Sequence, residues 1–203
     1  IDLYQLFNTK NILKMINELK TMIKKILGIK YYSIGENSFL AYPEKIMNPT
    51  KNQSKIVIGD NSVIHCQIQI LGHGGQVKIG NHCFIGENSY IWSGKSIKIG
   101  NRVLIGHNCN IFDNDGHPFD KDERHTQFKK IISTGHPKNI NLSDSEVIIE
   151  DDVWVGANVS VLKGTRIGRG AIIGAGSIVS KDIMPFTVNA GNPSKILRRL
   201  NEK

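Results

Sequence analysis

Residues 149–180, IEDDVWVGANVSVLKGTRIGRGAIIGAGSIVS, place an isoleucine or valine at every sixth position. The members of this series are Ile149, Val155, Val161, Ile167, Ile173 and Val179. Such a period is typical of a parallel β-helix, in which three short strands make one triangular coil and each aliphatic side chain stacks inside on its counterpart one coil away. The stretch therefore predicts an all-β solenoid.

The same period runs through the earlier part of the chain in three trios, each of which predicts one coil: Ile58, Ile64 and Ile70; Ile79, Ile85 and Ile91; Ile99, Ile105 and Ile111. Glycine follows many of these residues, as in Ile85-Gly86 and Ile105-Gly106. Glycine suits a corner at which a side chain would crowd the backbone. An amphipathic helix or a sandwich strand would not produce this pattern.

Insertions interrupt the period at three places. Two are small, between Ile70 and Ile79 and between Ile91 and Ile99, whereas the third separates Ile111 from Ile149. A solenoid tolerates insertions at its corners, and a structureless connection of this length is uncommon unless it is functional or disordered. We therefore expect a long protruding loop over residues 113–147 that carries the function.

The length and composition fit one solenoid domain, since 203 residues with 39% hydrophobic content can bury a continuous core. We expect a helical segment over residues 1–33, a β-helix over 34–185 and an extension with a short helix over 186–203. Apolar residues at helical spacing between residues 3 and 27 predict an amphipathic helix. This helix either caps the open end of the solenoid or associates weakly with a membrane surface.

The charge and the cysteines restrict the possible partners and the compartment. The formal net charge of +8 is spread along the chain, and no basic groove interleaved with aromatic residues or other nucleic-acid motif is present, so nucleic acid is not favoured. The odd set of Cys66, Cys83 and Cys109 argues against a disulfide framework. We expect these thiols to face inward in a reducing cytoplasm.

Four motifs distinguish this chain from other solenoids. Residues 111–120 read IFDNDGHPFD, with Arg124 downstream, and three more motifs are DVWVG at 152–156, IGAGSIVSKD at 173–182 and AGNPSK at 190–195. With these motifs, residues 56–200 resemble the hexapeptide-repeat acetyltransferases. The likeness is to the branch that acetylates sugar hydroxyls, including the maltose and galactoside enzymes and those that modify capsule or lipopolysaccharide. The resemblance implies a left-handed β-helix that forms a homotrimer, active sites between subunits, and acetyl-CoA as co-substrate.

His117 is the candidate general base. Transfer of acetyl from a thioester to a hydroxyl requires a base, because a protonated alcohol is a poor nucleophile at neutral pH. An unperturbed imidazole, with a pKa of about 6.5, is mostly neutral there and can return the proton to the departing thiolate. Direct attack of the hydroxyl on the thioester needs no covalent intermediate.

Asp113 and Asp115 precede His117 in a D-x-D-x-H arrangement. Alternation at the end of a strand would place both carboxylates on the face of His117, one holding the imidazole N–H and the other binding acceptor hydroxyls. Two alternatives remain open. One is that the aspartates are Asx-type turn residues that open the loop, and the other is a metal site with Asp and His ligands.

The resemblance also implies roles for residues that bind the two substrates. Trp154 would line the acetyl and acceptor site or pack in the trimer interface, and Arg124 would anchor the loop or meet the acceptor. Asn88 is the candidate donor to the oxyanion, although Gly86 is the alternative match. Small side chains at Ala157 and Ala175 would let the pantetheine arm lie along the coils. The adenosine and phosphate end would meet Ser180, Lys181 and Arg198, with Lys163 and Arg166 as weaker candidates.

The sequence thus predicts an acetyl-CoA-dependent O-acetyltransferase of a saccharide. Three alternatives remain: an N-acetyltransferase of an amino sugar, a trimeric zinc carbonic anhydrase on the same fold, and a non-catalytic binding solenoid. The anhydrase needs histidines that converge from adjacent coils, whereas His82 and His107 occupy different repeat positions. The identity of the acceptor is not predicted.

Overall fold

The computed structural model describes residues 12, 15, 16, 19 and 30–201. Contacts divide the chain into two units, residues 1–31 and 32–203. The predicted N-terminal helix lies largely outside the described residues, although Ile12, Met15, Ile16 and Leu19 are helical. Among the described residues, no helix is both long enough and apolar enough to cross a bilayer.

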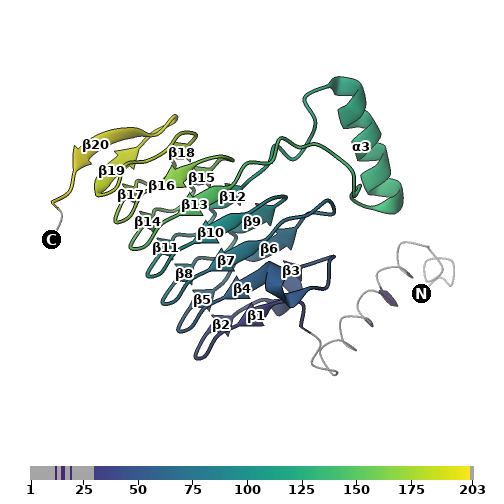
Figure 1. The fold of residues 1–203 in the computed structure, drawn as a ribbon, viewed down its shortest axis with the longest axis horizontal. Helices are drawn as coiled ribbons and strands as arrows, with labels where there is room; N and C mark the ends of the chain where they lie inside the picture. The colour runs from purple at the N-terminus through teal and green to yellow at the C-terminus, as the bar shows by residue number, and fades with distance from the viewer. Residues whose placement is uncertain (1–11, 13–14, 17–18, 20–29, 202–203) are drawn as a thin grey trace, which may run out of the picture. The chain divides into compact units, whose positions relative to one another are not determined.

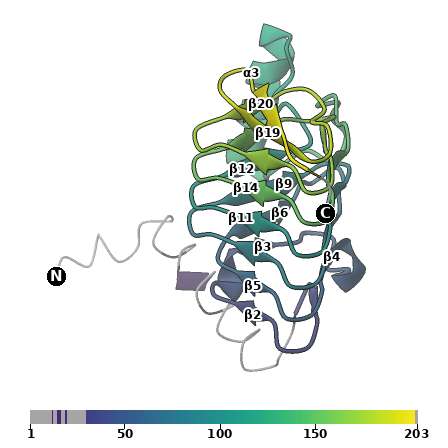
Figure 2. The same cartoon turned by 90° about the vertical axis from the view of Figure 1, so that its left-hand side faces the viewer.

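Residues 32–201 form a three-faced parallel β-helix, in which successive strands, except the last two, join successive sheets (Figures 1 and 2). The first sheet contains β1 (Ser33–Ile34), β4 (Ile56–Ile58), β7 (Val77–Ile79), β10 (Ile97–Ile99), β13 (Val147–Ile149) and β16 (Arg166–Ile167). The second contains β2 (Phe39–Leu40), β5 (Val63–Ile64), β8 (Phe84–Ile85), β11 (Leu104–Ile105), β14 (Trp154–Val155), β17 (Ile172–Ile173), β19 (Thr187–Ala190) and β20 (Lys195–Arg199). The third contains β3 (Ile46–Met47), β6 (Gln67–Ile70), β9 (Tyr90–Ser93), β12 (Asn110–Phe112), β15 (Ser160–Val161) and β18 (Ile178–Val179).

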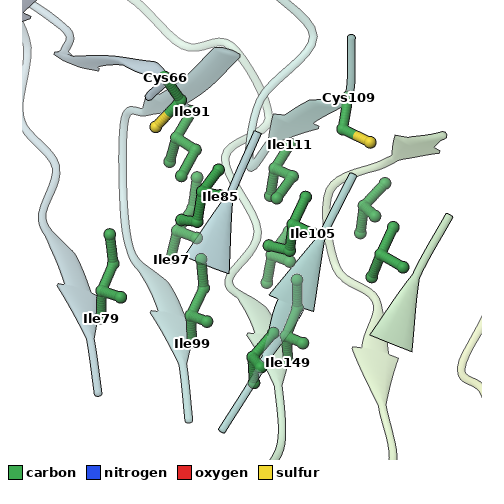
Figure 3. Close-up of a cluster of buried hydrophobic side chains, with 14 of the residues drawn as sticks. Cys66, Ile79, Ile85, Ile91, Ile97, Ile99, Ile105, Cys109, Ile111 and Ile149 are labelled. Atoms are coloured by element: carbon green, nitrogen blue, oxygen red, sulfur yellow. The ribbon is translucent and has the colours of Figure 1, made fainter. Parts of the chain in front are cut away.

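The six-residue series forms the core, as predicted. In the second sheet Ile105 pairs with Ile85 on one side and Val155 on the other, and all three are fully buried. Figure 3 shows the same stacking in the neighbouring ladders. One member of the predicted series is wrong: Ile68, not Ile70, pairs with Ile91. The corner between β5 and β6 is two residues shorter than the corner between β8 and β9, so the stacked position moves to Ile68. Ile70 lies two residues further along the same strand and also points inward.

Side chains at one corner form a second ladder that holds successive coils in register. The Oδ1 atoms of Asp60, Asn81, Asn101 and Asp151 each accept a backbone N–H from the preceding coil, at 2.7–2.9 Å. Another corner requires glycine, since a Cβ on Gly106 would lie 2.7 Å from the backbone nitrogen of Ala157. Corner glycines are therefore a steric requirement of coil stacking, as the sequence predicts.

The three cysteines are free and buried, as expected. Burial raises the pKa of the Cys66 thiol to about 12 and also raises the pKa values of Cys83 and Cys109. Thiols with raised pKa values are poor nucleophiles at neutral pH. These side chains therefore pack as small hydrophobes.

The long insertion leaves the coils between β12 and β13, and it is not structureless. It contains α3 (Lys121–Thr134), which stands beyond the edge of the third sheet in Figure 1. Asp120 caps this helix, because its side chain accepts the N–H groups of Asp122 and Glu123. Two backbone hydrogen bonds close the base of the insertion, from Ser145 N to Asp113 O at 2.7 Å and from Asp115 N to Leu142 O at 3.1 Å.

The expected C-terminal helix is wrong for residues 186–201. The chain instead extends the second sheet with β19, turns through residues 191–194 and returns as β20, which pairs antiparallel with β19. Gly191 supplies a positive φ of 105° in that turn. The free edge of β19 would otherwise present unpaired backbone groups, and pairing with β20 satisfies them.

Candidate active site

His117 lies in the segment between β12 and α3, with its side chain exposed. Its Nδ1 is 2.7 Å from the amide oxygen of Gln127, a residue of α3 that is only 3% exposed. The amide nitrogen of Gln127 donates to the carbonyl of Gly116 at 3.1 Å. Sequence reasoning missed Gln127, because the contact depends on a helix inside an insertion that carries no six-residue repeat.

Asp113 supports the neighbouring coil rather than the imidazole. Its side chain is completely buried. Its two oxygens accept five hydrogen bonds at 2.7–3.0 Å, from Ser93 Oγ, the backbone N–H groups of Gly94, Lys95 and Ser96, and Asn114 Nδ2. The carboxylate therefore closes the turn between β9 and β10.

Asp115 likewise has another partner. Its carboxylate accepts a hydrogen bond from Lys163 Nζ at 2.5 Å, with both side chains less than one-third exposed. The predicted bond between a carboxylate and the imidazole is therefore replaced at Nδ1 by the bond to an amide.

The chain turns at Asn114, directly after the strand. Strand alternation ends at Phe112, and the Oδ1 atom of Asn114 accepts the N–H of Gly116. The Asx turn thus belongs to Asn114, between the two aspartates.

Arg124 anchors the segment that carries His117, which is one of its two expected roles. Its guanidinium donates to the carbonyls of Pro118 and Phe119, at 3.1 and 3.0 Å. Because Arg124 lies in the first turn of α3, these bonds tie the start of the helix back to the loop. Arg124 and Gln127 therefore hold the His117 segment from the same helix.

Trp154 lies on a different sheet from the strand that leads to His117. It is 54% exposed on β14 and pairs with Leu104 and Ile172. These residues belong to an outward series on the second sheet, the apolar ladder: Phe39, Val63, Phe84, Leu104, Trp154 and Ile172. Phe39 and Leu104 are also at least half exposed. The apolar ladder runs along most of the prism.

Asn88 occupies the corner after β8 and has a positive φ of 56°. Asn108 and Asn158 adopt the same conformation at the equivalent corners of the following coils. Gly86 stacks on Gly106, where a Cβ would lie 2.8 Å from a backbone carbon. Asn88 is therefore an exposed corner residue, and Gly86 has no room for a side chain.

The expected cofactor residues lie on the last coils at three places. Ala157 and Ala175 stack at the same corner, where Gly176 N donates to Ala157 O at 2.9 Å. Ser180 and Lys181 are exposed at the corner after β18, and Arg198 is exposed on β20. The structure therefore brings the two alanines together but leaves the polar residues at separate positions.

The weaker cofactor candidates already have carboxylate partners. Lys163 pairs with Asp115, and Arg166 pairs with Glu150.

The histidines considered for a zinc site lie at different corners. His107 accepts the backbone N–H of Glu87 at 3.0 Å, at a corner different from that of His82. Within residues 30–201 and the four described residues before them, no group of three or more His, Cys, Asp or Glu side chains could hold a metal ion.

Comparison with known proteins identifies the repeats. Residues 146–181 match the model described as bacterial transferase hexapeptide (six repeats), and residues 76–112 match the hexapeptide repeat of succinyl-transferase. A curated relative from Staphylococcus aureus, 2,3,4,5-tetrahydropyridine-2,6-dicarboxylate N-acetyltransferase, is 52% identical over 60 residues. That match covers 30% of this chain and 25% of the relative. The chain therefore spans only about a quarter of the length of the curated relatives it matches.

Solved structures resemble the chain over most of its length. The hexapeptide-repeat acetyltransferase VCA0836 from Vibrio cholerae, complexed with acetyl coenzyme A, is 26% identical with a TM-score of 0.54, covering 86% of this chain and 74% of that one. AntD, an N-acyltransferase from Bacillus cereus complexed with dTDP and 3-hydroxybutyryl-CoA, is 20% identical with a TM-score of 0.65. The AntD match covers 90% of this chain and 88% of that chain, and at this identity it shows the fold alone.

Proposed function

The chain belongs to the hexapeptide-repeat transferases, and from this premise we propose that it is an acetyl-CoA-dependent acetyltransferase that acts on a saccharide hydroxyl. The observation that carries the proposal is His117: an exposed imidazole held at Nδ1, on the insertion that leaves the coils. The coils on either side of this insertion are the two stretches that match the family models.

His117 acts as the general base in this proposal. The imidazole accepts the proton of the acceptor hydroxyl while the oxygen attacks the thioester carbonyl. When the tetrahedral intermediate collapses, the C–S bond breaks and the proton passes from the imidazolium to the departing thiolate. The products are the acetyl ester and coenzyme A. Holding both substrates against one imidazole supplies proximity, and a backbone N–H would stabilise the oxyanion.

The last coils would bind acetyl-CoA. Ala157 and Ala175 leave the corner of two successive coils free of large side chains, which suits an extended pantetheine arm. Ser180, Lys181 and Arg198 are exposed, and the two cations are suited to phosphate oxygens. We expect acetyl-CoA to raise the melting temperature, because a ligand that binds only the folded state stabilises it. Arg198→Ala should weaken that shift, whereas Arg199→Ala serves as the neighbouring control.

A homotrimer with left-handed coils completes the proposed enzyme. The apolar ladder is a contiguous and exposed apolar surface, and such surfaces mark interaction sites. Trp154 lies within the ladder, so an interface there would bring Trp154 of one subunit close to a neighbouring subunit. The buried thiols suit the reducing cytoplasm in which we place the protein.

The experiment is mass spectrometry of a saccharide pool incubated with the protein and acetyl-CoA carrying a labelled acetyl group. The proposal predicts a labelled ester that mild alkali removes. The proposal would be contradicted if the saccharides remained unlabelled while the protein stayed folded and the acetyl-CoA stayed intact.

A second candidate is N-acetylation of an amino sugar, which uses the same base and the same cofactor path. It is favoured by the curated relatives, whose name is that of an N-acetyltransferase. Matched acceptors that differ only by hydroxyl or amine at one carbon separate the two activities. If only the amine-bearing acceptor becomes labelled, and alkali does not remove the label, the activity is N-acetylation rather than O-acetylation.

A further inference from the structure

We infer that Gln127 is a positioning residue for the base: it holds His117 in the tautomer that carries its proton on Nδ1 and thereby keeps the Nε2 lone pair available for the acceptor hydroxyl. This inference rests on the proposed function for its catalytic meaning. The tautomer itself is a property of the free protein and can be measured without any substrate.

The orientation of the Gln127 amide follows from its two partners. One end of the amide lies 3.1 Å from the carbonyl oxygen of Gly116, which can only accept a hydrogen bond, so the NH2 group must be at that end. The amide oxygen then lies 2.7 Å from Nδ1 of His117. Because Gln127 is only 3% exposed, both ends of its amide need partners, and the two bonds provide them.

The tautomer follows from that orientation. An amide oxygen only accepts, so Nδ1 must carry the hydrogen, and a neutral imidazole with Nδ1–H has its lone pair on Nε2. Within the described part of the chain, Gln127 is the one hydrogen-bond partner of the ring, and the side chain is exposed. Nε2 is therefore the nitrogen available to a substrate.

A neutral partner also has an electrostatic consequence. A carboxylate at Nδ1 would favour the imidazolium, whereas an amide orients the ring without adding negative charge. Two charged groups beside the His117 segment have other partners: Asp115 pairs with Lys163, and Arg124 donates to backbone carbonyls. Glu123 and Lys130 lie on α3 with Gln127, and the hydrogen bond to Nδ1 comes from neither of them. Asp113 is saturated by five donors. The amide of Gln127 is thus the contact that distinguishes the two ring nitrogens.

Two substitutions separate positioning from simple support of the fold. Gln127→Met keeps an unbranched side chain of similar length but removes both hydrogen bonds. Gln127→Glu retains an acceptor toward Nδ1 and adds a negative charge. The matched control is Gln69→Glu, which makes the same chemical change on β6, in the third sheet. In the full-length protein with ring-15N histidine, NMR identifies the His117 tautomer, and the signal is assigned with His117→Gln.

The wild type should show Nδ1–H at His117, and Gln127→Met should lose that preference. Gln127→Glu should move the titration of this ring to higher pH by about one unit or more, because the added carboxylate favours the imidazolium. With an identified acceptor, Gln127→Met should lower kcat about tenfold or more with KM for acetyl-CoA unchanged. The acidic limb of the Gln127→Glu rate profile should shift upward with the NMR titration.

An Nε2–H tautomer in the wild type, or a titration in Gln127→Glu identical to that of Gln69→Glu, would overturn the inference. If the NMR results hold and no acceptor is acetylated, the proposed function fails while the positioning of the ring stands. If Gln127→Met or Gln127→Glu fails to fold, the tautomer of His117 in the wild type, which needs no substitution at position 127, still decides the question.

Discussion

At the residue scale, three polar side chains within five positions have three different partners. Asp113 closes a turn of the previous coil, Asp115 pairs with a lysine from a later coil, and His117 reaches a glutamine on α3. The motif in the sequence predicts His117 as the base, and that role remains a prediction. The sequence does not predict these partners, because strand periodicity stops at Phe112 and each partner comes from a different element.

Asp113→Asn should lower the free energy of unfolding by about 2–4 kcal/mol, because an NH2 group would face backbone donors that then remain unpaired in the interior. The control is Asp115→Asn, which removes a partly exposed ion pair and should cost about 1 kcal/mol or less. Urea unfolding at one protein concentration measures both. Equal stability of Asp113→Asn and the wild type would show that the carboxylate does not support the turn.

At the element scale, the strands were predictable and the inserted elements were not. The aliphatic series placed the stacked positions correctly except at Ile70, because inward packing alone fixes a six-residue period. α3 has no repeat to reveal it, and only three of its fourteen residues are hydrophobic. The expected short helix within residues 186–203 is wrong, and the sequence carries no signal that the edge of β19 pairs with β20.

Ile105→Ala should destabilise the protein by about 2–5 kcal/mol, through lost burial and the cavity left between the coils. Leu104 is the neighbour of Ile105, has a side chain of the same composition, points outward and is 50% exposed. Leu104→Ala should therefore lower the free energy of unfolding of the monomer far less. Denaturant unfolding under conditions that keep the protein monomeric compares the pair. Similar losses for both variants would contradict the inward and outward assignment.

The Asp152 carboxylate should make stability depend on acidic pH. Its hydrogen bond with Arg102 lowers the pKa of Asp152 below its usual range, and Arg169 contributes further. A lowered folded-state pKa adds stability that is present above the unfolded-state pKa and is lost as pH falls through the folded-state value. Asp152→Asn should therefore be less stable than the wild type near neutral pH.

Melting temperatures measured from pH 7 down to pH 2 test this dependence. The difference between wild type and Asp152→Asn should narrow below about pH 4, where the unfolded carboxylate becomes protonated. Asp122→Asn is a suitable control, since the Asp122 side chain is 82% exposed and its ion pair among the described residues is with its neighbour Lys121. A difference that stayed constant across the range would exclude the ion pair as its cause.

At the scale of the whole molecule, the solenoid follows from the sequence, whereas the residues of the proposed active site lie on more than one face of the prism. His117 follows the third sheet, and Trp154 lies on the second. The motifs predict both residues as parts of the site but do not predict that they lie on different sheets. The order of the motifs along the chain does not show which faces of the prism come together. Association of subunits through the apolar ladder is our explanation for the separation.

Leu104→Glu should break the proposed trimer, because it places a charge in the middle of the apolar ladder. The matched control is Val57→Glu, at an outward position of the first sheet. Light scattering should give three times the 22.6 kDa chain mass for the wild type and the control, and a single chain for Leu104→Glu. A wild-type monomer, or an intact Leu104→Glu trimer, would contradict this interface.

The most direct test of the whole account is the acetyl-transfer rate of His117→Ala, measured with labelled acetyl-CoA and an acceptor from the saccharide screen. We predict a loss of about a hundredfold or more, the contribution of a general base, with the oligomeric mass and the thermal shift by acetyl-CoA unchanged. Transfer by His117→Ala at the wild-type rate would contradict the central claim.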